Sequence, residues 1–267
     1  NEFYKEYLDA APLFCKDDKV DLKDFIKRYI KFGDEKDIIF EIENGEIRPS
    51  TVLADSMVSL MKGNKEFTLI DDQKEVFEEA KALAKKSKVG TKQVLIVEGG
   101  PGTGKSVVAI NLLVELTKLG LVSQYVTRNS APRDVYEAKL TGTMKKTQFS
   151  NMFKGSGSFH DTSSNAFDVL IVDEAHRLNL KSGMFSNLGE NQVKEVINAS
   201  HFSIFFIDEA QRVTLKDIGS KQEIEKWASA FDCEVTHRKL ESQFRCAGSD
   251  GYLAWLDNAL DIRSTAN

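Results

Sequence analysis

The sequence of 267 residues contains no apolar run that approaches the ~20 residues a membrane-spanning helix needs. It has only three cysteines, Cys15, Cys233 and Cys246, an odd number without a CxxC pair. These absences argue against a membrane protein, a disulfide framework and a structural zinc site. The spacing of the histidines is not typical of a metal site either. We therefore expect a globular protein of a reducing cytoplasm.

Two further features are missing. The first residues, 1–5, contain neither an initiator Met nor the apolar core of a signal peptide, so we expect the chain to be cut from a longer protein. The chain also lacks excess basic charge, because 36 Lys and Arg face 41 Asp and Glu. The charge is uneven, however: residues 1–50 sum to −4 and residues 125–157 to +4. We expect a polyanion to bind the second stretch, although an ordinary solvated surface can have the same excess of positive charge.

What the sequence does contain divides it into three parts. Residues 1–65 predict a small N-terminal α+β subdomain, with a hairpin at Asn44-Gly45 and a helix after it. Residues 66–240 alternate apolar strands with helices, beginning with a helix capped by Asp72 and Glu75. Continuous apolar strands predict a parallel sheet covered on both faces, with ligands at the carboxyl ends of its strands. Residues 241–267 are expected to begin a second domain.

The stretch VEGGPGTGKS, residues 97–106, stands between a predicted strand and a predicted helix, with Walker A spacing. Its glycines let backbone N–H groups surround a phosphate, and the helix N-terminus adds its dipole. Lys105 should reach the β- and γ-phosphates, and Ser106 should ligate Mg²⁺. The predicted nucleotide-binding residues of this turn are Gly99, Gly100, Pro101, Gly102, Thr103, Gly104, Lys105, Ser106 and Val107.

A second apolar strand ends in an acidic pair, in the stretch VLIVDEAH. Asp173 is placed to hold Mg²⁺ through water, and Glu174 to orient and deprotonate the attacking water. Such a pair can also cap a helix. With a Walker A turn upstream, the pair favours hydrolysis over phosphoryl transfer to a metabolite.

Six segments in order, FTLIDDQ, GGPGTGKS, YVTRNSAPRDVYEAKL, VDEAH, IDEAQ and LESQFR, resemble the superfamily 1 helicase series from the adenine-reading Q motif to motif IV. Nearly the whole chain resembles a bacterial family catalogued as a domain of unknown function and described as Schlafen-like P-loop ATPases. IENGEIRPS, VDEAHRLN, KDIGS and SQFRCAGSDGYLAWLD are among the segments that carry this resemblance. It implies a RecA-like P-loop NTPase fold of the α/β class, with ATP and Mg²⁺ as ligands.

Further site residues follow from the resemblance. Gln73 would read the adenine edge, and the chain has no NKxD guanine signature. Gln211 would sense the γ-phosphate and link it to a bound strand, and Arg245 would approach that phosphate across the cleft between two RecA-like domains. Where the superfamily usually has Gly-Asp, this chain has Ile207 and Asp208. His176 is expected to hydrogen-bond toward Gln211 or the strand-binding side, not to a metal.

The segment VTRNSAPRDVYEAKL resembles motif Ia, which contacts a nucleic-acid backbone. Phosphate contacts of this kind position a strand without reading its sequence. Phe149, Phe153 and Phe159 either stack on unpaired bases or belong to the core. The residues expected to contact single-stranded nucleic acid, DNA or RNA, are Arg128, Asn129, Ser130, Arg133, Lys145 and Lys146.

Taken together, the sequence predicts the ATP-binding and hydrolysing core of a superfamily 1-like, nucleic-acid-dependent ATPase, a helicase or translocase in the intact protein. Motifs V and VI are missing from the chain, so we do not expect processive unwinding by this piece. Two alternatives remain open. One is an ATP-dependent switch that acts on a protein partner. The other is an oligomeric AAA-type ATPase in which Arg245 acts on a neighbouring subunit.

Overall fold

The computed structural model describes residues 14, 18–29, 68–88, 90–130, 133, 134, 136, 150–183, 187–212, 214, 216–241, 255 and 258. The chain forms two compact units, Asn1–Gly45 and Glu46–Asn267. In the first unit, helix α2 (Lys19–Tyr29) brings the ring of Phe25 within 5.3 Å of Phe14 and 5.1 Å of Tyr29, between ring centroids. The predicted hairpin and the helix after it lie outside the described residues. The predicted boundary after residue 65 falls within the second unit and remains a prediction.

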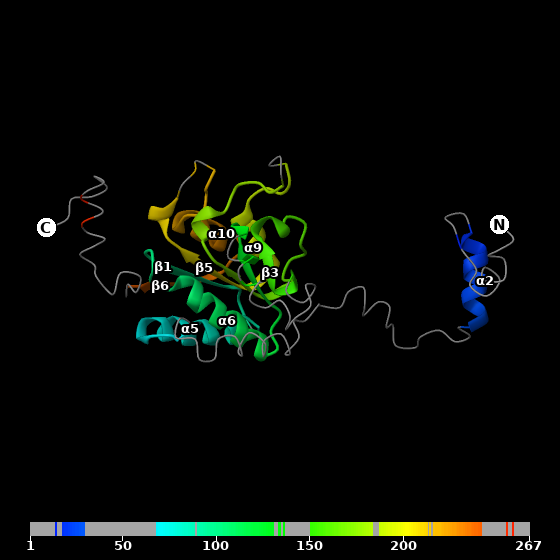
Figure 1. Ribbon diagram of the computed structural model, residues 1–267, viewed down its shortest axis with the longest axis horizontal. Helices are drawn as coiled ribbons and strands as arrows, with labels where there is room; N and C mark the ends of the chain where they lie inside the picture. The colour runs from blue at the N-terminus through cyan, green and yellow to red at the C-terminus, as the bar shows by residue number, and fades with distance from the viewer. Residues whose placement is uncertain are drawn as a thin grey trace. The chain divides into compact units, whose positions relative to one another are not determined.

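A six-stranded parallel sheet forms the centre of the second unit (Figure 1). The order of its strands is β3-β2-β4-β5-β1-β6. The strand β5 thus separates β1, which leads into the Walker A turn, from β4, which leads into the acidic pair. The strands are β1 (Gln93–Gly99), β2 (Ser123–Thr127), β3 (Phe153–Gly155), β4 (Phe167–Val172), β5 (Ser200–Ile207) and β6 (Glu234–Leu240).

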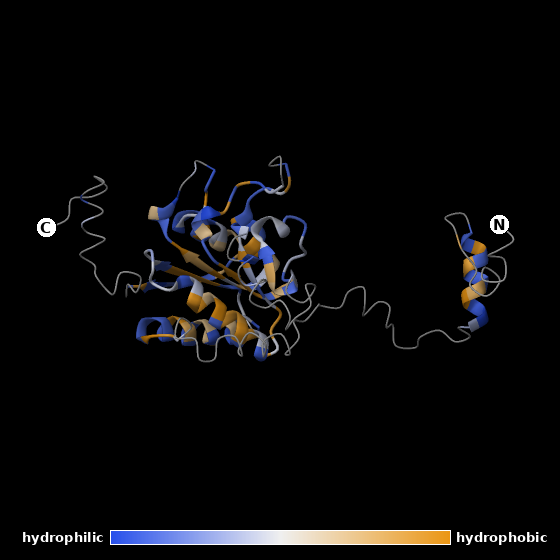
Figure 2. Cartoon of the chain, viewed as in Figure 1, coloured by the Kyte–Doolittle hydropathy of each residue, from blue (hydrophilic) through white to orange (hydrophobic). Residues whose placement is uncertain are grey.

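Helices cover both faces of this sheet, as Figure 1 shows. Because side chains alternate along a strand, Leu95 and Val97 join one core cluster while Val94 and Ile96 join another. The first cluster lies under α5 (Asp71–Ser87) and α6 (Lys105–Lys118), and the second under α9 (Gln192–Ala199) and α10 (Lys221–Ala230). Figure 2 shows the apolar strands between helices whose outer sides are hydrophilic. This is the RecA-like P-loop arrangement that the sequence predicts.

The parallel direction of the strands brings four chain segments to one edge of the sheet. The strands β1, β2, β4 and β5 end at Gly99, Thr127, Val172 and Ile207, and the residues after these positions carry the predicted site. Ligands of open α/β sheets bind at this edge. No helix within the described ranges is long and apolar enough to cross a membrane.

The first helix of the sheet domain differs from the prediction at its start. The prediction that Asp72 and Glu75 cap it is wrong, because α5 begins at Asp71 and its N-cap is Ile70. The side chain of Gln73 reaches back instead, and its Oε1 accepts a hydrogen bond of 3.2 Å from the backbone N–H of Ile70. The apolar face of the helix consists of the buried Val76, Ala80 and Ala84 and the partly buried Phe77 and Leu83.

The Gly/Ser-rich stretch after β3 contains a short 3₁₀ helix, η3 (Ser156–Ser158), which precedes one of the three Phe residues considered as stacking platforms. Phe153 and Phe159 are 3% and 2% exposed, and each packs in a core cluster. They are therefore core residues and not stacking platforms for bases. Phe149 lies outside the described residues.

Candidate functional site

The turn from β1 into α6 is a glycine-rich loop with its N–H groups at a helix start. Gly102 and Gly104 have φ angles of 79° and 85°, a left-handed conformation that glycine adopts without strain. Gly104 is the N-cap of α6, a helix of 14 residues. A Cβ on Gly99 would lie 2.5 Å from Thr103 Oγ1, so the loop also needs glycine at its entrance. This geometry suits a phosphate group at the helix N-terminus.

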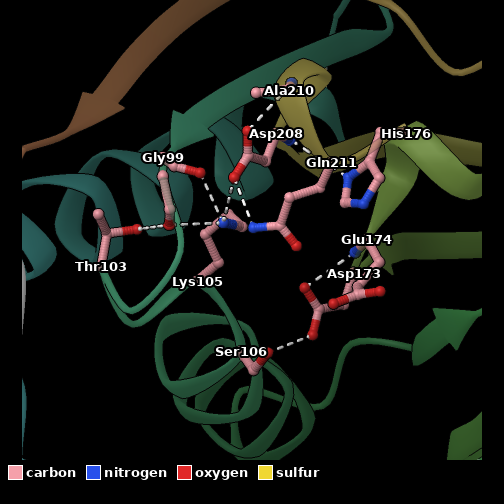
Figure 3. A network of polar contacts seen from close by, with 11 residues as sticks. Gly99, Thr103, Lys105, Ser106, Asp173, Glu174, His176, Asp208, Ala210 and Gln211 are labelled. Atoms are coloured by element: carbon pink, nitrogen blue, oxygen red, sulfur yellow. Dashed lines mark hydrogen bonds and ion pairs between the residues drawn. The ribbon is translucent and has the colours of Figure 1, made fainter. Parts of the chain in front are cut away.

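Lys105 folds back over this loop. Its Nζ donates hydrogen bonds to the backbone carbonyls of Gly99 at 2.5 Å and Gly100 at 2.9 Å. The carboxylate of Asp208, from the end of β5, lies 3.9 Å from the same Nζ. The side chain is only 10% exposed. The loop therefore holds a cation in place beside the N–H groups that would face a phosphate (Figure 3).

Asp173 meets two hydroxyl groups at the end of β4. Ser106 Oγ donates to Asp173 Oδ2 at 2.6 Å, and Tyr125 Oη, from β2, donates to the same oxygen at 2.6 Å. The backbone N–H of Glu174 donates to Oδ1 at 2.9 Å. Burial, and then the charge of Asp173, raises the pKa of Tyr125 well above its ordinary value, so its hydroxyl stays protonated and donates. Tyr125 is not among the site residues predicted from the sequence, where its one signal is a phenol within a strand.

Glu174 occupies an unusual backbone conformation. Its φ and ψ are 53° and 45°, in the left-handed region that non-glycine residues rarely adopt. Such strain gathers at functional sites, because the surrounding structure must hold it in place. Here it turns the chain directly after Asp173 into the short helix η4 (Ala175–Arg177) and leaves Glu174 beside the Ser106–Asp173 contact (Figure 3).

A second network joins the ends of β4 and β5. The backbone N–H of Asp208 donates to Nδ1 of the buried His176 at 3.2 Å, and Gln211 Nε2 donates to Asp208 Oδ2 at 2.6 Å. Gln211 belongs to the short helix η5 (Glu209–Gln211). Burial lowers the pKa of His176, which favours the neutral ring with Nδ1 as acceptor. His176 thus reaches Gln211 through Asp208, which also lies beside Lys105.

Gln73 lies against the phosphate loop. It is 3% exposed, and its Nε2 donates to the carbonyl of Thr103 at 2.9 Å. The contact with the loop is close, because a Cβ on Gly104 would lie 2.3 Å from that nitrogen. The structure therefore brings Gln73 together with the Walker A turn, although 30 residues separate it from Thr103.

The predicted strand-contacting residues are in three different situations. Arg128 pairs with the fully buried Asp217 at 3.1 Å, and Arg177 approaches the other oxygen of that carboxylate at 3.3 Å. Asn129 and Ser130 are exposed at the end of β2, and the guanidinium of Arg133 lies beside Gly155. Two of the predicted residues, Lys145 and Lys146, lie outside the described residues, as does Arg245.

The oxygens present fit Mg²⁺. Within the described part of the chain, no three His, Cys, Asp or Glu side chains are grouped to hold a metal ion. Mg²⁺ does not need such a group, because it commonly binds through one or two protein oxygens together with nucleotide phosphates and water. Ser106 and Asp173 provide a hydroxyl and a carboxylate 2.6 Å apart at the mouth of the phosphate loop.

Comparison with known proteins gives relatives of two kinds. The uncharacterized protein YPL245W of Saccharomyces cerevisiae is 24% identical over 186 residues, which cover 61% of this chain and 40% of that protein. The chain therefore spans less than half the length of this relative. Solved structures match weakly. A DNA replication initiation factor has a TM-score of 0.37 and 13% identity, over 75% of this chain and 55% of its own. AMPPCP-bound DnaA from Aquifex aeolicus has a TM-score of 0.36 and 12% identity, over 74% and 55%.

A family model matches about two thirds of the chain. The model of the Schlafen group 3 DNA/RNA helicase domain matches residues 92–267. This range begins just before β1 and contains every strand of the sheet. Since the match covers more than half of the chain and includes the phosphate loop and the acidic turn, the chain belongs to the Schlafen group 3 DNA/RNA helicase domain family.

Proposed function

We propose that this chain is the ATP-binding and hydrolysing core of a superfamily 1-like, nucleic-acid-dependent ATPase, a helicase or translocase in the intact protein. The observation that carries the proposal is the 2.6 Å contact between Ser106 and Asp173. It joins the helix that follows the phosphate loop to the strand end that carries Glu174. Membership of a helicase domain family supports the nucleic-acid part of the proposal.

Each polar group of this edge has a distinct task in the proposed hydrolysis. Lys105 and the loop N–H groups bind the β- and γ-phosphates. Ser106 and Asp173 would hold Mg²⁺, which neutralises charge that develops on the phosphate oxygens. Glu174 orients the attacking water and accepts its proton. The strained turn at Glu174 supports this task, because it holds the backbone of this residue directly beside the Ser106–Asp173 contact.

Two amides extend the site. Gln211 would sense the γ-phosphate, and its hydrogen bond to Asp208, 3.9 Å from the Lys105 ammonium, supports a position near that phosphate. Gln73 would read the adenine edge. Its amide uses one donor for Thr103 and one acceptor for Ile70, which leaves one of each for a base. Arg245 would stabilise the leaving phosphate from a second domain.

We place the nucleic-acid strand at the end of β2 and along the basic stretch that follows. Asn129 and Ser130 are exposed there and suit hydrogen bonds to phosphate oxygens. Arg128 would contribute through the exposed part of its side chain, which is 34% accessible to solvent. Arg133, Lys145 and Lys146 would add positive charge without reading sequence.

The test is the ATP hydrolysis rate with single-stranded DNA, single-stranded RNA or neither, over a range of salt concentrations. We expect one polymer to raise the rate, with a stimulation that falls steeply as salt rises. Arg133→Ala and Lys145→Ala should weaken strand binding whatever the sequence, and should reduce the salt slope by about one each. Lys118→Ala removes the same charge from the far end of α6 and should change neither quantity.

Other results would contradict the proposal. Normal ATP binding without stimulation by either polymer would favour a switch that acts on a protein partner. A specific activity that disappears on dilution would favour an oligomeric AAA-type ATPase.

A further inference from the structure

Tyr125 is a buried residue at the site to which the proposed function assigns no role in binding or hydrolysis. It lies on β2, directly beside the strand that carries the acidic pair, with Tyr125 opposite Ile171 in the parallel register. Side chains alternate along strands, so Tyr125, Ile171 and Asp173 share the face of the sheet that α6 covers. The side chain of Tyr125 is completely buried. Its hydroxyl thus reaches Asp173 from within the protein.

The ring of Tyr125 is fixed by other aromatic rings. Its centroid lies 5.4 Å from that of Phe153 and 6.4 Å from that of Tyr136. Distances in this range are typical of favourable aromatic pairs. Packing therefore sets the position of the ring, and the hydrogen bond to Asp173 is made by a hydroxyl that is already in place. A rigid donor of this kind can restrain a carboxylate that has two rotatable bonds.

The hydrogen bonds of Asp173 are distributed unevenly between its two oxygens. Oδ2 accepts from Tyr125 and Ser106, both at 2.6 Å, whereas Oδ1 accepts from the backbone N–H of Glu174 at 2.9 Å. An ionised carboxylate has about two acceptor positions on each oxygen. Those of Oδ2 are filled, and one on Oδ1 remains. The hydroxyl of Tyr125 thereby directs the remaining acceptor capacity of Asp173 to one oxygen.

Because Asp173 is buried, its hydrogen bonds also stabilise the negative charge of its carboxylate. Asp173 is 2% exposed, so water contributes little to the solvation of its carboxylate. A buried charge needs hydrogen bonds to replace that solvation. Ser106 is shared with the nucleotide side of the site, because it belongs to the helix that starts at the phosphate loop. Tyr125 is the side-chain donor that comes from the sheet side.

We propose that Tyr125 is a positioning residue for Mg²⁺. It holds the Asp173 carboxylate in the orientation that receives the ion, although it does not itself touch metal or nucleotide. The proposal rests on the proposed function, since it assumes that Asp173 and Ser106 hold Mg²⁺ with ATP. Partners that orient a metal-binding carboxylate typically change metal affinity or activity about 10- to 100-fold when they are removed.

The experiment measures binding and not turnover. A fluorescent, non-hydrolysable ATP analogue is titrated with Mg²⁺ on the 267-residue chain, and also in EDTA without any Mg²⁺. Tyr125→Phe keeps the ring and removes only the hydroxyl. We expect the Mg²⁺ concentration at half-maximal enhancement of binding to rise about tenfold, with metal-free affinity unchanged. Unchanged metal-free affinity also shows that the variant is folded.

Two further variants separate positioning from general loss of packing. Thr117→Val removes another buried hydroxyl, on α6, whose oxygen has no hydrogen-bond partner among the described residues, and should leave the Mg²⁺ midpoint unchanged. In an Asp173→Asn background, Tyr125→Phe should cause no further shift, because the group through which Tyr125 acts is gone.

The outcomes distinguish this inference from the function on which it rests. A wild-type midpoint in Tyr125→Phe, or an equal loss of binding with and without Mg²⁺, would overturn the positioning role alone. So would an undiminished further shift in the Asp173→Asn background. A wild-type chain that binds the analogue at no Mg²⁺ concentration would instead overturn the proposed ATP site.

Discussion

Gly219→Ala is predicted to be among the most damaging single-methyl additions in this fold. Gly219 follows Asp217 and Ile218, whose backbone packs on the segment after η4: the N–H of Ile218 donates to the carbonyl of Leu178 at 2.8 Å. A Cβ at Gly219 would lie 1.8 Å from the carbonyl oxygen of Ala175. It would also lie 2.9 Å from the Cα of His176. These are backbone atoms, so no side chain can rotate out of the way.

The size of the effect follows from that geometry. Cβ atoms essentially never approach other atoms closer than 3.0 Å, so one of the two segments must move by about 1 Å or more. Added groups in a packed interior cost about 1–3 kcal/mol, and we expect the upper end here because the backbone must shift. For a domain of this size, about 3 kcal/mol lowers the melting temperature by about 6–12 °C. Since Ala175 directly follows Glu174, hydrolysis should fall with stability.

Thermal and urea unfolding of the variant, beside a matched control, measure this loss of stability. Gly90→Ala adds the same methyl group where the nearest atom, the carbonyl oxygen of Lys86, lies 3.7 Å away, an ordinary van der Waals contact. It should leave stability unchanged or raise it by up to about 1 kcal/mol, because alanine restricts the unfolded chain. Gly219→Ala with a wild-type melting temperature would refute the close approach of these two segments.

Three other predictions concern single side chains. Lys105→Ala should abolish ATP binding at concentrations that saturate the wild type, because the loop loses its cation; an equilibrium titration with undiminished affinity would contradict the nucleotide site. Asp217→Asn should destabilise the fold by about 2–4 kcal/mol in urea, because Arg128 and Arg177 lose a fully buried negative partner, and a wild-type midpoint would contradict this. Because the folded-state pKa of His176 lies below the ordinary 6.5, the unfolded chain takes up its proton first, so stability should fall as the pH drops below about 6.5. His176→Gln should show a shallower pH dependence of the urea midpoint over that window, and an identical dependence would contradict the assignment.

The features that sequence alone predicts are those set by neighbouring residues. The Walker A turn depends on glycines at fixed spacing before a helix, and the predicted helix follows the turn as α6, from Lys105 to Lys118. The strands that end at Gly99 and Ile207 are apolar enough to identify without a structure. The acidic pair after β4 can be identified for the same reason, because it ends an apolar strand. The residues that lie beside it in space cannot be identified from the sequence alone.

The remaining features depend on the order of the strands, which no local pattern contains. The strand β5 lies between β1 and β4, and this alone brings Asp208 to Lys105. The strand β6 has the polar sequence EVTHRKL and is not predicted as a strand, because an edge strand need not be apolar on both faces. Tyr125 lies 48 residues from Asp173, and only the pairing of β2 with β4 joins them.

We propose that this chain binds Mg²⁺ and ATP at the loop before α6 and hydrolyses ATP with Glu174. The most direct test is phosphate release from ATP by the wild type and by Glu174→Gln, with and without a single strand, beside a binding titration of both proteins. We expect equal ATP binding and a rate about 100-fold or more lower in Glu174→Gln, because the amide cannot accept the proton of the attacking water. Equal rates in the two proteins would contradict the role of Glu174 in hydrolysis.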